Sequence, residues 1–320
     1  MNKTIEKIVS LCKQRGFVYQ SSEIYGGFGA VYDYGPLGVE LKNNIANYWW
    51  KEMTQIHENI VGLDSGILMH PKIWEASGHV GEFHDPLVDC KQCKSRYRAD
   101  ELSDNINNEK WDKIKCPKCG VTGMMTSPRQ FNLMFKTQVG PVEESGATAY
   151  LRPETAQGIY VNYQLVQGST RMKIPFGIAQ IGKAFRNEII ARNFIFRTRE
   201  FEQMEMEFFC KPDSTKEWLK FWCDERMKWF ESLGINKEKL RLRSHGDDEL
   251  AHYSSACYDI EYKFDFGWSE LEGIADRGTF DLDQHMTASN KKLTYFDQVN
   301  NEHFESLQKS PEQFQVLSMQ

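Results

Sequence analysis

Residues 194–209 carry the most regular pattern in the chain, an alternation that is typical of a β-strand, because successive side chains of a strand point to opposite faces. One predicted face carries Arg197, Arg199, Phe201, Gln203, Glu205 and Glu207. The other carries Phe196, Thr198, Glu200, Glu202, Met204, Met206 and Phe208. The first face is cationic at its start and anionic at its end. It suits a ligand with phosphates at one end and an ammonium group at the other.

Other segments have periodicities that predict the remaining elements. A second strand is expected earlier in the chain, over 174–181 and on through 185–188. A basic loop that contains Arg192 joins it to the strand over 194–209. Helices are predicted at the N-terminus, over 39–53, over 73–83 with an end near 78–81, and over 158–166 and 214–233. Further strands are predicted over 63–69 and 130–136, and residues 241–300 are expected to alternate short strands and turns.

Residues 86–126 differ in amino-acid composition from the rest of the chain. They are polar and contain two Cys-x-x-Cys pairs, Cys90 with Cys93 and Cys116 with Cys119. Two such turns can present four thiolates in a tetrahedron, which Zn²⁺ prefers, and a closed four-sulfur site is structural. The same cysteines could instead form two unconnected thiol pairs or a disulfide, although a reducing cytosol disfavours disulfides.

Composition narrows the class of protein. The net charge of −6 argues against a zinc-ribbon protein whose main role is non-specific nucleic-acid binding. No apolar run approaches the length of a membrane span, and the N-terminus lacks the apolar core and cleavage site of a signal peptide. We therefore expect a cytoplasmic location and no membrane partner.

Two arginines and two carboxylates are the candidate binding groups. Arg186 and Arg197 are expected on neighbouring strands, where planar guanidinium groups can clamp phosphate oxygens. Glu154 and Glu205 are placed to hold a small ammonium group. Each of these residues alone could equally belong to a surface ion pair, but burying so many charges without a ligand would be costly.

Several motifs together resemble one enzyme family. Residues 185–188 and 197–205 look like motif 2 of class II aminoacyl-tRNA synthetases, in the version of dimeric glycyl-tRNA synthetases. The segments 24–27, 32–38, 74–79, 98–100 and 151–158 are similar to that family too. The helix–strand unit that ends at Pro71 resembles motif 1, which forms the dimer interface in such enzymes. The resemblance spans residues 1 to about 304.

The resemblance implies an α+β fold, with an antiparallel sheet flanked by helices and an inserted zinc ribbon. The catalytic core would comprise residues 1–85 and 127–320, and the ribbon residues 86–126. The implied reaction is ATP-dependent activation of glycine to glycyl-adenylate, followed by transfer to tRNA(Gly). The implied cofactors are ATP, Mg²⁺ and structural Zn²⁺, and the implied assembly is a homodimer through motif 1.

By the same resemblance, the residues expected to carry the chemistry are Arg186, Arg197 and Glu188. The expected glycine-binding residues are Arg98, Glu154, Phe201, Glu202, Gln203 and Glu205. The expected ATP-binding residues are Arg186, Asn187, Glu188, Phe196, Arg197, Thr198, Arg199, Glu200, Phe201, Glu270 and Leu271, and the Glu270 carboxylate could hold magnesium.

The sequence departs from the family pattern in two places. Ala191 stands where the family often has proline. After residues 295–297 we find no motif 3, with its Glu-Pro-Ser and arginine, and no anticodon-binding domain. The chain is therefore expected to be C-terminally incomplete, truncated before motif 3. The alternative interpretation is a synthetase-like protein that binds glycine, ATP or tRNA without full catalysis.

Overall fold

A computed structural model describes residues 3–103, 106, 110–141, 147–189, 194–246, 249–250, 254–297, 302–304 and 315–319. The basic loop with Ala191 and Arg192 lies outside the described residues. So do residues 305–311, which follow the family-like segment.

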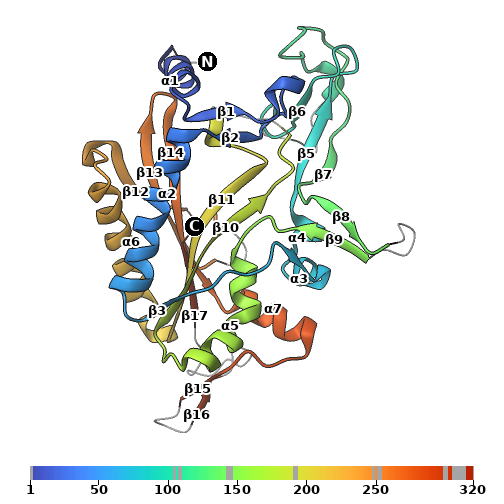
Figure 1. Ribbon diagram of the computed structural model, residues 1–320. Helices are drawn as coiled ribbons and strands as arrows, with labels where there is room; N and C mark the ends of the chain where they lie inside the picture. The colour runs from blue at the N-terminus through green and yellow to red at the C-terminus, as the bar shows by residue number, and fades with distance from the viewer. Residues whose placement is uncertain are drawn as a thin grey trace.

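An antiparallel sheet forms the centre of the molecule (Figure 1). Within the described ranges it has seven strands, in the order β12-β13-β14-β17-β11-β10-β3. The strands are β3 (Ile60–Gly62), β10 (Phe176–Phe185), β11 (Glu200–Cys210), β12 (Leu240–Ser244), β13 (Ala256–Phe264), β14 (Gly267–Gly278) and β17 (Gln315–Met319). Neighbouring strands are antiparallel except for β3, which pairs parallel to β10.

One face of this sheet is covered by two helices, α2 (Pro36–Lys51) and α6 (Thr215–Ser232). A π-helical turn, η2 (Glu52–Ile56), continues α2. Trp49 of α2 and Trp222 of α6 share a buried apolar cluster with Met206 and Phe208 of β11. The Tyr48 ring also stacks on Trp229, with centroids 6.1 Å apart, so the two helices contact each other directly.

The opposite face packs against α5 (Ala156–Thr170) and α7 (Phe280–Ser289). Tyr160 and Tyr163 of α5 form a second buried cluster with Phe176 and Phe209 of the sheet and Leu282 of α7. Helices on both faces therefore bury a sheet whose strands carry apolar residues on each side.

Smaller elements surround this core (Figure 1). At the N-terminus lie α1 (Lys3–Gln14), β1 (Val18–Gln20), the 3₁₀ turn η1 (Glu23–Tyr25) and β2 (Tyr32–Tyr34). A sheet of β4 (Leu68–Met69), β9 (Ala147–Leu151) and β8 (Lys136–Val139) lies beside α3 (Pro71–Ala76) and α4 (His79–Glu82). The remaining pair is β15 (Tyr295–Asp297) with β16 (Glu302–Phe304), and the remaining 3₁₀ turns are η3 (Trp111–Lys113), η4 (Phe194–Phe196), η5 (Pro212–Ser214) and η6 (Lys237–Lys239).

The cysteine-rich region extends from its own sheet. β5 (His84–Asp89) pairs with β6 (Arg96–Arg98) and with β7 (Arg129–Asn132). A separate buried cluster lies beneath the cysteines and includes Val88, Trp111 and Met125. This region thus has apolar contacts of its own, in addition to its connection to the core through β5 and β7.

The predicted two-strand unit is present, with a later start to its second strand. β11 begins at Glu200, whereas the alternation indicated a strand from Phe194. Residues Phe194–Phe196 form the 3₁₀ turn η4, and Phe194 has a φ of 64°. Its ring packs edge-on against Tyr32 at 5.2 Å, a tertiary contact that the local pattern cannot reveal.

Three other predictions were wrong in detail. The short helix expected from 73, with an end near 78–81, already ends at Ala76, and a second helix, α4, follows Gly78, whose φ of 83° favours glycine. The expected strand over 63–69 is limited to β4, and the backbone N–H of Ser65 donates to the Gln180 side chain and not to the backbone of a neighbouring strand. Residues 280–289, expected as strands and turns, form α7. None of the described helices is long and apolar enough to span a membrane.

Candidate active site

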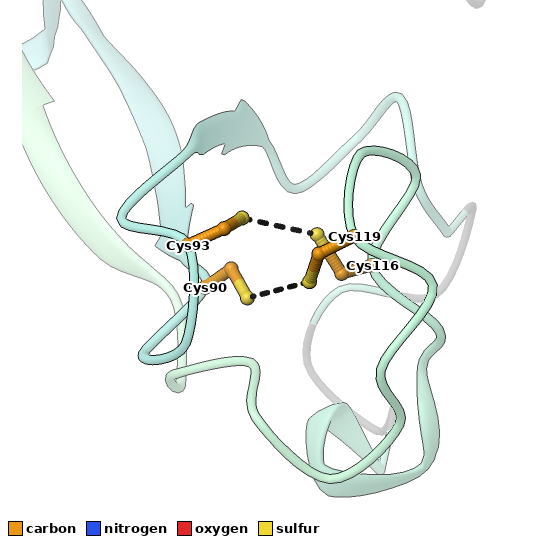
Figure 2. Close-up of side chains that lie close together, drawn as sticks. All are labelled: Cys90, Cys93, Cys116 and Cys119. Atoms are coloured by element: carbon orange, nitrogen blue, oxygen red, sulfur yellow. Dashed lines mark hydrogen bonds between the residues drawn. The ribbon is translucent and has the colours of Figure 1, made fainter.

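The two Cys-x-x-Cys turns meet in space (Figure 2). The Sγ atoms of Cys90 and Cys119 are 3.7 Å apart, and those of Cys93 and Cys116 are also 3.7 Å apart. All four Sγ atoms lie within 4.8 Å of one another. The cysteines are free thiols. The spacing is too long for disulfides, whose S–S bond is about 2.05 Å.

The donor set fits zinc. Sulfur atoms about 2.3 Å from a tetrahedral ion lie about 3.8 Å from one another, close to the distances between these thiols. Hydrogen bonds from the Cys119 backbone N–H and from the Tyr97 hydroxyl lower the pKa of the Cys116 thiol to about 6. The Tyr97 hydroxyl lies 3.4 Å from that sulfur. These hydrogen bonds therefore favour the thiolate of Cys116, the form that binds metals.

A cavity of about 550 Å³ opens between strands β13 and β14 on one side and the 77–83 segment on the other. Its polar lining includes His79, Glu154, Arg186, Asp259, Glu270 and Arg277. This volume falls in the range of small-molecule sites. Both carboxylates and guanidinium groups border the space, so one ligand could meet cations and anions at different ends.

Glu154 is a buried carboxylate of this cavity, with 8% of the residue exposed. It follows β9, just before α5 begins. His79 Nε2 lies 3.5 Å from its Oε2, and the Gln157 side-chain amide donates to its Oε1 at 2.9 Å. Burial opposes its ionisation, but His79, Arg277 and Gln157 prevail and hold the pKa of Glu154 well below its usual range. The residue is thus a carboxylate at neutral pH.

A hydrogen-bonded network fixes the surroundings of Glu154. The Gln157 amide also donates to Asp281 Oδ1 at 2.9 Å, and its oxygen lies 2.7 Å from His285 Nε2. Asp281 in turn accepts from Arg277 Nε at 2.7 Å and from its Nη2 at 3.0 Å. The helices α5 and α7 are thereby linked to β14, and Arg277 is held at the wall of the cavity.

Arg186 lies where this cavity meets a second one. Its Nε donates to the Pro153 carbonyl at 3.0 Å, and its guanidinium carbon lies 5.5 Å from the Phe83 ring and 5.3 Å from the Phe201 ring. Its backbone N–H donates to the Arg199 carbonyl at 2.9 Å. Both rings lie within cation–π distance of the guanidinium group, which also borders both cavities.

The second cavity, of about 640 Å³, lies between α2 and the ends of β10 and β11. Predicted site residues that line it are Arg186, Glu188, Phe196, Arg197, Thr198, Glu200, Phe201 and Glu202. Burial raises the pKa of Glu188, whereas the nearby Arg197 acts to lower it. The structure therefore divides the predicted residues between two cavities that share Arg186.

Six predicted residues line neither cavity. Arg199 donates to the carbonyls of Glu188 and Gly29, at 2.9 and 3.1 Å, and so ties the motif 2 segment to the N-terminal region. Asn187 is tied through its backbone N–H to the Leu133 carbonyl at 2.8 Å. Leu271 packs against the apolar cluster under α6.

The other three make polar contacts within the fold. Gln203 accepts from the Thr155 backbone N–H at 3.0 Å, and buried Glu205 accepts from the Thr155 hydroxyl. Arg98 lies 3.0 Å from Asp85 and 2.6 Å from Asp100.

Several residues of the first cavity were missed by the sequence interpretation. Arg277, near the end of β14, lines this cavity and forms an ion pair with Asp281, four positions later in the first turn of α7. The missed helix therefore also concealed this ion pair. His79 lies in the family-like segment 74–79, in which no local pattern distinguishes a cavity residue. Asp259 lies opposite Gly273, a pairing that is shifted by a bulge between Ile260 and Glu261. Simple alternation along β14 could not predict this register.

The fold and the site define a class of protein. The family of tRNA synthetase class II core domains (G, H, P, S and T) matches residues 135–308, which include α5, β10, β11 and the wall formed by β13 and β14. The chain therefore belongs to the class II tRNA synthetase core family.

Individual relatives are more specific. A glycine--tRNA ligase of Treponema denticola is 60% identical over 297 residues, which cover 93% of this chain and 64% of that protein. Glycine--tRNA ligases of Borreliella burgdorferi ZS7 and Ruminiclostridium cellulolyticum are 57% and 55% identical, over 91% and 94% of this chain and 64% and 69% of theirs. The chain thus spans about 64% of the length of the Treponema denticola relative.

Proposed function

We propose that this chain is the catalytic region of a glycine–tRNA ligase, which activates glycine with ATP and transfers it to tRNA(Gly). The observation that carries this proposal is the cavity that contains the ionised Glu154 carboxylate and the Arg186 guanidinium. The similarity to proteins named glycine--tRNA ligase supports the choice of amino acid.

Glu154 would receive the ammonium group of glycine. The carboxylate oxygen of glycine would then attack the α-phosphorus of ATP, and the bond to the pyrophosphate oxygen would break. Arg186 would neutralise charge on the α-phosphate, and Arg277 would contribute a second cation at the opposite wall. The protein supplies no nucleophile, so catalysis rests on positioning and electrostatic stabilisation.

The remaining predicted nucleotide contacts lie across Arg186. Phe196, Arg197 and Phe201 line the neighbouring cavity, so we propose that the nucleotide lies along the boundary between the two spaces. Glu270 is a residue of the first cavity. Its pKa is raised mainly by burial and, to a smaller extent, by the negative charge of Asp259. Glu270 would hold Mg²⁺, which supplies positive charge to the phosphates.

The finer assignments of the fold are also proposals. Residues 86–126 would be a zinc ribbon, and their four-thiol geometry supports structural Zn²⁺. We propose a homodimer through the helix–strand unit that ends at Pro71, where the exposed apolar side chains of Ile56 and Leu68 would be covered. We propose a cytoplasmic location, as expected of an enzyme that charges tRNA.

The test of the site is ATP binding by an Arg186→Ala variant. We expect ATP affinity to fall about 10- to 100-fold, because a charge-assisted hydrogen bond to a phosphate is lost from a partly enclosed site. Isothermal titration calorimetry measures this directly. The matched control is Arg129→Ala, since Arg129 is an exposed arginine on β7 whose partner is Asp89. Unchanged ATP affinity in a folded Arg186→Ala protein would refute the assignment.

A further inference from the structure

Three residues with metal-binding side chains meet at one wall of the first cavity. Cys257 and Asp259 lie two positions apart on β13 and therefore share a face of the sheet. His245 follows the end of β12, and its backbone N–H donates to the Cys257 carbonyl at 3.0 Å, which extends the pairing of the two strands. The His, Cys and Asp donor atoms all lie within 4.8 Å of one another.

We propose that His245, Cys257 and Asp259 form a second metal site, specific for a borderline-soft divalent cation such as Zn²⁺. None of the three has a part in the glycine activation proposed above. The inference does not depend on that function, because the bound metal can be measured without any activity.

The donor types distinguish this site from a magnesium site. Mg²⁺ takes hard oxygen ligands in octahedral geometry and binds thiols and imidazoles poorly. One imidazole, one thiolate and one carboxylate suit zinc, with three protein ligands and an open fourth position. The site also differs from the four-cysteine cluster, because all three residues line the cavity and leave the fourth position accessible.

The present geometry requires only a small adjustment. His245 Nε2 and Asp259 Oδ2 are 2.7 Å apart, a hydrogen-bond distance. Nitrogen and oxygen ligands about 2.0–2.2 Å from a tetrahedral zinc ion are about 3.3–3.5 Å apart. The ion would therefore replace this hydrogen bond and increase the distance between the two atoms by about 0.6–0.8 Å. Both side chains remain partly accessible to the cavity, which allows this movement.

A glycine pairs with the cluster across the two strands and brings a fourth, carboxylate-bearing residue beside it. Gly273 pairs with Asp259 across the two strands. A Cβ atom on Gly273 would lie 3.2 Å from Glu270 Oε1, so the Glu270 carboxylate lies over this glycine, beside the cluster. The Glu270 carboxylate is therefore close enough to be a fourth ligand of the ion. In that case Zn²⁺ and the Mg²⁺ that we assign to Glu270 would compete for this carboxylate.

Zinc stoichiometry of the purified chain tests the proposal. We expect two zinc ions per wild-type chain after equilibration with Zn²⁺ at low micromolar concentration, measured by inductively coupled plasma mass spectrometry. The Cys257→Ala variant should bind one, because the four-cysteine cluster remains. The matched control Cys12→Ser, which removes a thiol from the second cavity, should still bind two.

Cobalt substitution identifies the ligands. In a Cys93→Ala/Cys116→Ala background, Co²⁺ bound at the second site should give a thiolate-to-metal absorption band near the ultraviolet. Adding Cys257→Ala should abolish the band, and adding His245→Ala should weaken Co²⁺ binding at least about tenfold. One zinc ion per wild-type chain, or two in folded Cys257→Ala protein, would overturn the proposal.

Discussion

At the scale of single residues, Glu154 shows how neighbouring groups keep a buried carboxylate ionised at a cavity wall. A carboxylate buried in protein is costly unless it is paired. His79, Gln157 and, at longer range, Arg277 offset that cost. The pairing explains why a buried glutamate remains ionised at the wall of a cavity that also contains arginines.

A Glu154→Gln substitution should weaken glycine binding about 10- to 100-fold, because a hydrogen bond to a charged group contributes about 1.5–3 kcal/mol. The variant keeps the shape of the side chain and removes its charge. Equilibrium dialysis with labelled glycine and a non-hydrolysable ATP analogue measures the effect. The control is Glu249→Gln, which removes another carboxylate from the same cavity. Equal glycine affinity in the wild type and Glu154→Gln would contradict the role.

The same substitution gives a prediction for stability. The pKa of Glu154 is lower in the folded chain than the unfolded value of about 4.3. The residue therefore stabilises the fold above about pH 4.3, and this contribution is lost as the pH falls through the depressed pKa. Urea unfolding should show a gap between the wild type and Glu154→Gln that is constant from pH 5 to 7 and narrows below about pH 4.3. A gap that widens on acidification would exclude this linkage.

At the scale of elements, a buried ion pair joins α6 to β14. Arg226 Nε and Nη2 lie 2.7 and 3.0 Å from the two Glu272 oxygens, and the side chains are 1% and 7% exposed. Arg226 also contacts the Trp229 ring at 4.4 Å. The pair is bidentate and desolvated, so each partner depends on the other.

Replacing only one partner of this pair should be strongly destabilising. Arg226→Leu leaves Glu272 buried without its cation, and we expect the free energy of unfolding to fall by about 3–5 kcal/mol. Arg226→Leu/Glu272→Leu should recover most of the loss, because no buried charge remains. Chemical denaturation of the wild type, Arg226→Leu, Glu272→Leu and the double variant measures the coupling energy between the two side chains. Additive losses in the double variant would show that the pair does not act as a unit.

The cysteine-rich region allows a second prediction at this scale. Its apolar cluster is separate from those under the central sheet, so metal loss should act locally. Chelation of zinc should increase amide hydrogen exchange over residues 86–126 by at least about tenfold and leave β10 and β11 unchanged, as measured by mass spectrometry. Equal increases in both regions would show that the cluster supports the whole fold.

At the scale of the whole molecule, the sequence predicted what depends on local pattern. The alternation in β11 places Met206 and Phe208 under α6 and Glu205 toward Thr155, as a strand requires. The four-cysteine cluster was predictable from the spacing of its residues. These features depend on neighbours in the sequence or on two tight turns.

Features set by tertiary contacts were not predictable in this way. The α7 helix has Leu282, His285 and Met286 at helical spacing, but this short signal lies in a region rich in strand formers. The bulge in β13 and β14 decides that Asp259 faces Gly273, and no local pattern predicts a bulge. The division of the motif 2 residues between two cavities likewise depends on how α2 and β14 pack around them.

The central claim is that this chain activates glycine, and glycine-dependent ATP–pyrophosphate exchange tests it most directly. The assay isolates adenylate formation, so it requires no tRNA. We predict exchange that depends on glycine, is not supported by alanine, and falls at least about 100-fold in Arg186→Ala and Glu154→Gln. An absence of glycine-dependent exchange in folded, zinc-loaded protein, or equal exchange with alanine, would contradict the account.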